Sequence, residues 1–85
     1  MDNASNITIN AKYITDIQIR DRYKNTVTVR INLIYGQPEN EYDCIDFGFD
    51  SYENAKKFYK WVVNEFKTKD IIELSNDEIY EKFDK

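Results

Sequence analysis

The stretch "TVTVRINLIY", residues 26–35, decides the fold, because apolar and polar side chains alternate along it. One phase holds Val27, Val29, Ile31 and Leu33, and the other holds Thr28, Arg30 and Asn32. A period of two over this length is typical of a β-strand with one face buried. We therefore predict a strand here, and we expect the flanking segments to supply its neighbours and the layer that covers it.

Upstream, residues 7–19 form a long run whose apolar side chains mostly share the odd phase. They are Ile7, Ile9, Ala11, Tyr13, Ile17 and Ile19. Because strands are usually about 3–10 residues long, we expect a bulge or break near Tyr13 and Ile14. The polar segment "RDRYKN", residues 20–25, is then the turn that joins this run to residues 26–35 as a hairpin.

Downstream, "GQPEN", residues 36–40, contains the only proline and one of the two glycines, which predicts a second turn. The segment "YDCIDFGF", residues 42–49, is predicted to be a third strand. Its side chains that should face the core are Ile45, Phe47 and Phe49. On the outer face, Asp46 is expected to pair with Arg30 across the two strands.

A helix is predicted to follow, because Asp50 and Glu53 have the spacing of a capping box. Its apolar side chains form one stripe at helical spacing, which should cover the odd face of the sheet. The stripe contains Tyr52, Ala55, Phe58, Tyr59, Val62, Val63 and Phe66.

The C-terminal part begins with "IIEL", residues 71–74, which is either a short fourth strand or an extended connection. "SNDEIYEKF", residues 75–83, then predicts a second helix, with Ser75 and Glu78 as another capping box. The 85 residues therefore predict one small α+β domain, residues 1–85. It should contain a three-stranded antiparallel sheet, which becomes four-stranded if residues 71–74 form a strand in it. An amphipathic helix should cover one face of the sheet, and a short C-terminal helix should follow.

The composition argues against an enzyme and against a bound cofactor. The chain has no histidine, which removes the commonest metal ligand and the usual proton shuttle near neutral pH. Its one cysteine, Cys44, lies between Asp43 and Asp46, whose charges disfavour a reactive thiolate. The acidic residues 39–50 do not form a calcium loop, because Cys44 and Asp50 occupy the positions that require glycine and glutamate. We expect no metal and no cofactor.

The charges favour a basic protein as partner. The net charge is −4, and acidic segments, residues 36–55 and 70–85, alternate with mildly basic ones. This balance disfavours direct binding to nucleic acid. The chain also lacks an apolar run of about 20 residues, and its N-terminus does not resemble a signal peptide. We expect a cytoplasmic protein that does not enter a membrane.

Acidic and amide side chains at two places are candidates for binding this partner. Glu39, Asn40, Glu41 and Asp43 follow the second turn. Asp77 and Glu78 lie in the first turn of the second helix. Each group also has a purely structural explanation: charges keep strand edges soluble, and carboxylates stabilise the positive end of a helix.

Trp61 is a third candidate, because it lies outside the apolar stripe of the long helix. Half-exposed tryptophans often anchor protein interfaces, so Trp61 and an open sheet edge could support a homodimer or a general interaction module. Alternatively, Trp61 covers the flank of the sheet or packs on the second helix. The basic hairpin tip around Arg22 and Tyr23 is a weaker nucleic-acid feature.

The segments "RINLIYGQPENEYDCI", residues 30–45, and "NAKKFYKWV", residues 54–62, resemble the small acidic type II anti-CRISPR proteins. The similarity lies in the layout of residues 29–83. An Arg-aliphatic-Asn strand leads through a glycine-containing turn to Asn-Glu-Tyr, residues 40–42. Another strand, a Lys-Phe-bearing helix and an acidic C-terminal segment follow.

The resemblance implies a phage-encoded inhibitor of a CRISPR nuclease. Such an inhibitor imitates the DNA duplex that contains the protospacer-adjacent motif, and it binds the nuclease where that duplex would bind. Asn40 and Glu41 would then meet the arginines that read the motif, with Glu39 as a near neighbour. Arginine's planar fork binds a carboxylate as readily as a guanine edge. We expect this inhibitor function first, the interaction module or homodimer second, and direct nucleic-acid binding third.

Overall fold

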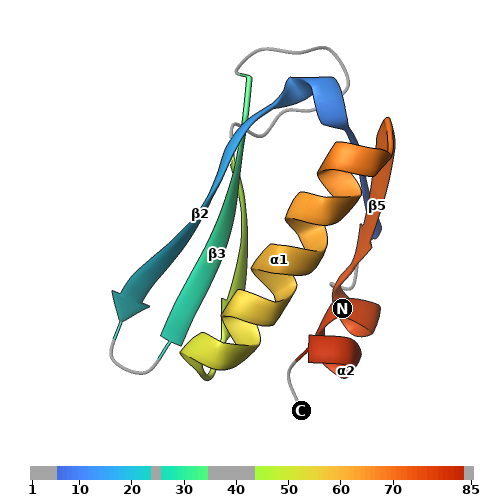
Figure 1. The fold of residues 1–85 in the computed structure, drawn as a ribbon. Helices are drawn as coiled ribbons and strands as arrows, with labels where there is room; N and C mark the ends of the chain where they lie inside the picture. Colours follow the sequence, from blue (N-terminus) through green and yellow to red (C-terminus); the bar gives the residue numbers. More distant parts are fainter. Residues whose placement is uncertain (1–5, 24–25, 35–43, 84–85) are drawn as a thin grey trace.

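The long helix α1 lies across a three-stranded sheet, and a two-stranded sheet and a short helix lie on its other side (Figure 1). This computed structural model describes residues 6–23, 26–34 and 44–83. The elements in chain order are β1 (Asn6–Asn10), the 3-10 turn η1 (Ala11–Tyr13), β2 (Ile14–Tyr23), β3 (Thr26–Leu33), β4 (Cys44–Phe49), α1 (Tyr52–Thr68), β5 (Ile71–Ser75) and α2 (Asn76–Phe83). The predicted α+β fold is confirmed.

Strand β3 is the centre of the three-stranded sheet, with β2 and β4 antiparallel on its two sides. The alternation predicted for residues 26–35 is confirmed over residues 29–33, where Val29 and Ile31 are completely buried. It is wrong at Thr28, which the alternation assigns to the polar face but which is only 3% exposed. On the other face, Arg30 lies opposite Asp46 in the register of β3 and β4. The Arg30 guanidinium donates two hydrogen bonds to the Asp46 carboxylate, at 2.8 and 2.9 Å, so the expected cross-strand pair is present.

The predicted break in residues 7–19 is confirmed at η1, and it divides the run between two sheets. Strand β1 pairs with β5, and β2 pairs with β3. Backbone hydrogen bonds hold both ends of η1: Ala11 donates to Asp70 at 2.8 Å, and Tyr13 accepts from Ile34 at 2.8 Å. Residues 71–75 form a strand, β5, but it pairs with β1 in the two-stranded sheet, so the alternative of a four-stranded sheet with β2, β3 and β4 is wrong.

The turn predicted at residues 20–25 is wrong for its first four residues. Residues 20–23 continue β2, and β3 begins at Thr26. Polar residues do not prevent strand pairing, because the backbone groups form the ladder. A bulge at Thr15, between the pairs Ile14–Leu33 and Asp16–Asn32, also shifts the phase of β2. Buried Ile14 and half-buried Ile17 can therefore both pack against the core despite their odd separation.

The predicted capping box of α1 is wrong by one residue. Ser51, rather than Asp50, is the N-cap, and its hydroxyl oxygen accepts from the backbone N–H of Asn54 at 3.1 Å. Ser51 adopts the extended backbone that an N-cap requires, which leaves Asp50 outside the helix. The predicted stripe is correct at its centre, where Ala55, Phe58 and Val62 are buried. Tyr52 is 54% exposed, because it stands at the first helical position, at the end of the stripe.

Six aromatic rings join α1 to β4 and α2. Phe58 is completely buried, and the centres of four other rings lie 5.1–6.0 Å from its own. These rings belong to Phe47, Phe49, Trp61 and Phe83. Tyr80 adds the sixth, and its hydroxyl accepts a hydrogen bond from the Gly48 backbone N–H at 3.2 Å. Helix α2, which begins directly after Ser75 as predicted, is thereby attached to the edge strand β4.

Replacement of Phe58 by alanine should lower the free energy of unfolding by about 3–5 kcal/mol, because it leaves a cavity between three elements. Urea denaturation followed by circular dichroism at 222 nm measures this loss. Tyr52→Ala is the matched control on the same helix, and it should change stability by less than about 0.5 kcal/mol because the ring is exposed. Equal effects of the two substitutions would contradict the packing described.

Ser51→Ala should destabilise the protein by about 1 kcal/mol, because the N–H of Asn54 loses its hydrogen-bond acceptor. Asp50→Ala should change stability by no more than about 0.5 kcal/mol. The same denaturation experiment ranks the two residues. A larger loss for Asp50→Ala would restore Asp50 as the helix cap.

Candidate functional site

The structure describes three of the seven residues predicted to bind a partner. Trp61 lies on α1, and Asp77 and Glu78 lie in the first turn of α2. The other four, Glu39, Asn40, Glu41 and Asp43, lie outside the described residues.

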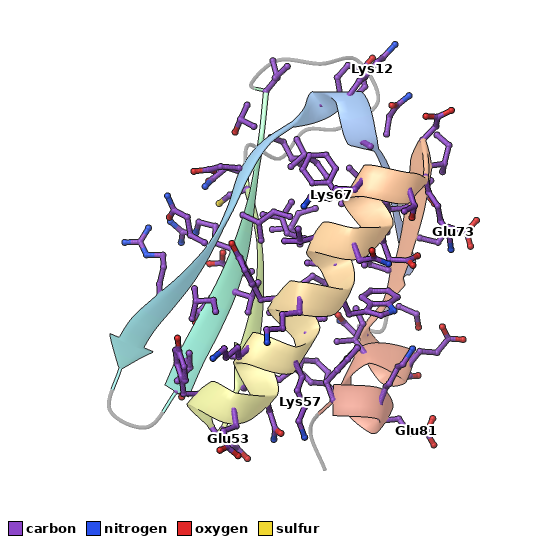
Figure 2. All side chains as sticks on the ribbon, in the orientation of Figure 1. Lys12, Glu53, Lys57, Lys67, Glu73 and Glu81 are labelled. Atoms are coloured by element: carbon purple, nitrogen blue, oxygen red, sulfur yellow. The ribbon has the colours of Figure 1, made fainter. Side chains whose placement is uncertain are left out.

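Four exposed carboxylates occur on the two C-terminal elements, and we call them the C-terminal acidic surface. They belong to Glu73, Asp77, Glu78 and Glu81. Strand β5 buries Ile72 and Leu74, so its alternation directs Glu73 away from the core. On α2 the three acidic residues fall within about 100° of arc, opposite the buried Ile79 and Phe83. Glu73 and Glu81 project from the β5 and α2 side of the molecule (Figure 2).

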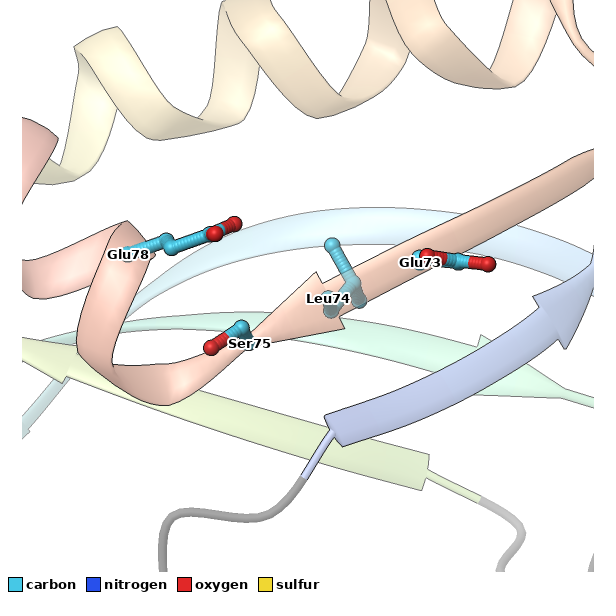
Figure 3. Close-up of a pocket in the computed structure, with 4 residues that line it drawn as sticks. All are labelled: Glu73, Leu74, Ser75 and Glu78. Carbon is cyan, nitrogen blue, oxygen red and sulfur yellow. The ribbon is translucent and has the colours of Figure 1, made fainter.

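Two adjoining hollows lie where β5 meets α2. One, of about 100 Å³, is lined by Glu73, Leu74, Ser75 and Glu78. Figure 3 shows the Glu78 side chain extending from α2 in the direction of β5, which carries Glu73, Leu74 and Ser75. The second, which we call the Trp61 hollow, has about 70 Å³, and its lining includes Trp61, Glu73, Ser75, Glu78, Lys82 and Phe83. Both are far smaller than the roughly 300–1,000 Å³ of metabolite sites, so they suit a single side chain rather than a metabolite.

Trp61 packs on the second helix, as one of the two predictions for it proposed. Its ring centre lies 5.6 Å from that of Phe83 and 6.0 Å from that of Phe58. The Lys82 ammonium lies over the indole, with Nζ 5.2 Å from the ring centre. Trp61 is half-buried, and its remaining surface helps to line the Trp61 hollow beside Glu73 and Glu78.

The fold therefore brings together two predicted residues, Trp61 and Glu78. It adds Lys82, which sequence reasoning did not single out, and Glu73, which belongs to the acidic segment 70–85 but was not among the predicted binding residues. Glu73 could have been found from the alternation of residues 71–75, once that segment was accepted as a strand. Lys82 carries no such signal, because its contact with Trp61 depends on how two helices pack. Asp77 is exposed but belongs to neither hollow lining.

The exposed face of α1 has the opposite charge. Lys56, Lys57 and Lys60, together with Glu53, line a shallow hollow of about 330 Å³. Lys57 and Glu53 lie in the first half of α1 (Figure 2). The lysines of α1 outnumber the glutamates, Glu53 and Glu65, on the same helix, whereas Glu73, Asp77, Glu78 and Glu81 make β5 and α2 mainly acidic. A charged partner can distinguish the two surfaces.

Within residues 6–23, 26–34 and 44–83, no group of three histidine, cysteine, aspartate or glutamate side chains could hold a metal ion. Cys44 is a free, half-buried thiol at the start of β4. In the same ranges, no helix combines the length and the apolar character that crossing a membrane requires.

Comparison with known proteins does not place the chain in a family. No family model matches the chain, and neither a curated protein nor a solved structure matches it significantly.

Trp61→Ala should lower the free energy of unfolding by about 2 kcal/mol, less than for a fully buried aromatic residue, because Phe58 and Phe83 lose a ring contact. Trp61→Phe keeps an aromatic ring and should lower the free energy of unfolding by less than Trp61→Ala does. Urea denaturation followed at 222 nm compares the variants without relying on tryptophan fluorescence. An unchanged stability of Trp61→Ala would show that the indole does not hold α2.

Proposed function

We propose that this chain is a non-enzymatic inhibitor that binds a basic, nucleic-acid-handling protein through exposed carboxylates. The observation that carries the proposal is the C-terminal acidic surface. Two elements from one continuous segment, β5 and α2, expose four carboxylates while Ile72, Leu74, Ile79 and Phe83 are buried. The adjoining hollows have the size of a side chain, which supports binding of a protein rather than a metabolite.

Carboxylates can replace nucleic acid at such a partner because arginine and lysine bind both. An arginine fork forms paired hydrogen bonds with a carboxylate as it does with a phosphate or with the edge of guanine. A surface whose charges have one sign also raises the rate of association with an oppositely charged protein surface. A protein that presents several carboxylates therefore competes with nucleic acid for the same basic groove.

The specific target that we propose is a type II CRISPR nuclease, in the cytoplasm of a host cell infected by a phage that encodes the chain. Support comes from the resemblance of residues 29–83 to small acidic anti-CRISPR proteins. In this proposal Asn40 and Glu41 meet the arginines that read the protospacer-adjacent motif, and the C-terminal acidic surface forms a second contact. A homodimer built on Trp61 has less support, because the indole already packs on Phe58 and Phe83.

Addition of the protein should inhibit cleavage of a target plasmid by a guide-loaded type II CRISPR nuclease, because the carboxylates would occupy the groove that binds the motif. Cleavage is measured as the protein is titrated. Glu39→Lys with Glu41→Lys should raise the concentration for half-inhibition at least about tenfold, since each loses an attraction and gains a repulsion. Asp77→Lys with Glu81→Lys should raise it less, if the C-terminal acidic surface is the second contact.

Asp50→Lys with Glu53→Lys is the matched control, because it reverses two exposed charges at the start of the other helix. It should leave inhibition unchanged within about twofold. No inhibition by the folded wild-type protein would reject this nuclease as the target. Equal losses in all three double variants would show that only overall charge matters, and not a specific acidic surface.

A further inference from the structure

The Trp61 hollow combines an aromatic wall with an acidic rim. Trp61 and Phe83 provide apolar and π surface, and Glu73 and Glu78 provide carboxylates from β5 and α2. Its size, about 70 Å³, excludes a nucleotide or a sugar but accommodates the end of one long side chain. An aromatic face flanked by carboxylates is the environment that a cationic group prefers outside water.

A cation from the protein itself already occupies part of this environment. Lys82 Nζ lies 5.2 Å from the centre of the Trp61 ring and 5.5 Å from that of Phe83. Lys82 is exposed, so its long side chain can move into water at little cost. The contact shows that a positive charge is accommodated against the indole, and it makes Lys82 a competitor for any external cation.

The shape and chemistry of the hollow favour arginine over lysine as the external cation. A planar guanidinium stacks on an indole face and simultaneously donates hydrogen bonds to carboxylates at its edges. A compact ammonium forms fewer of these contacts at once. Glu73 and Glu78 come from different elements, so they can accept from different edges of one guanidinium.

We propose that the Trp61 hollow binds an arginine side chain of a basic protein partner, and that this arginine displaces Lys82 from the Trp61 ring. The proposal deepens the proposed function and rests on it for the identity of the partner as a basic protein. It assigns Trp61, Glu73 and Glu78 as the residues that hold the guanidinium. Lys82 then sets the affinity, because the hollow is competent only when Lys82 has left it.

A direct test uses the chain's only tryptophan as the reporter. A blocked Gly-Arg-Gly-Arg-Gly peptide is titrated into the protein while Trp61 fluorescence is recorded. The arginine peptide should produce a saturable change. The same peptide with citrulline in place of arginine, which has a similar shape and no charge, should bind at least about tenfold more weakly. Equal binding of the two peptides would overturn the proposal.

Substitutions then locate the site. Glu73→Gln with Glu78→Gln should weaken arginine-peptide binding about tenfold, whereas the matched neutralisation, Asp50→Asn with Glu53→Gln, should weaken it less than about twofold. Lys82→Gln should tighten binding about threefold or more, because the internal competitor is lost. Lys57→Gln makes the same change in net charge outside the hollow and should have a smaller effect. Equal effects of Lys82→Gln and Lys57→Gln would contradict displacement.

The plasmid-cleavage assay separates failure of this inference from failure of the proposed function. Arginine-peptide binding that depends on Glu73 and Glu78, without inhibition of the nuclease, would support the hollow and reject the nuclease as partner. Inhibition by wild-type protein that Glu73→Gln with Glu78→Gln leaves unchanged, with no binding of the peptide, would overturn the hollow and retain the inhibitor function. All variants are first compared with the wild type by circular dichroism to establish that they fold.

Discussion

The position of the acidic side chains on α2 depends on the packing around Phe58. Its ring is completely buried and contacts aromatic rings from β4, α1 and α2. Helix α2 has eight residues, too few to be stable alone in water, where isolated helices shorter than about 12–15 residues are marginal. Its helical form therefore comes from burying Ile79 and Phe83 against this cluster. The acidic residues of α2 share one exposed face because Ile79 and Phe83, on the opposite face, are packed against this cluster.

The position of Glu73 on β5 depends on the short turn η1, because η1 moves the N-terminal strand β1 out of the three-stranded sheet. If residues 7–19 ran straight on beside β3, β1 would not pair with β5. Hydrogen bonds from Ala11 to Asp70 and from Ile34 to Tyr13 hold the turn between the two ladders. In the resulting sheet, Thr8 lies opposite Glu73 and Ile9 opposite Ile72. The pairing thus sets which side of β5 enters the core and which carries a carboxylate.

The arrangement of charge explains how a chain with a net charge of only −4 can present a distinctly acidic surface. Lysines predominate on α1, where Lys56, Lys57 and Lys60 lie together, and carboxylates predominate on β5 and α2. Lys82 is the lysine of α2, and its ammonium lies over Trp61. Because Lys82 lines the same hollow as Glu73 and Glu78, its positive charge offsets part of their negative charge in the isolated protein. A partner that draws Lys82 away would meet a more acidic surface than the isolated protein presents.

The sequence by itself determined the α+β class, the strands within residues 26–33 and 44–49, the break in residues 7–19, and the buried centre of α1, because these depend on local periodicity. It also indicated the Arg30–Asp46 pair, since neighbouring strands with known phase fix which side chains face each other. Only the tertiary structure decided that residues 71–75 pair with β1 and that Lys82 lies over Trp61. Those contacts join segments far apart in the chain, and local patterns carry no information about which distant surfaces meet. The choice of Ser51 over Asp50 as helix cap is a smaller case, in which two good caps compete and the entry of the chain into the helix selects one.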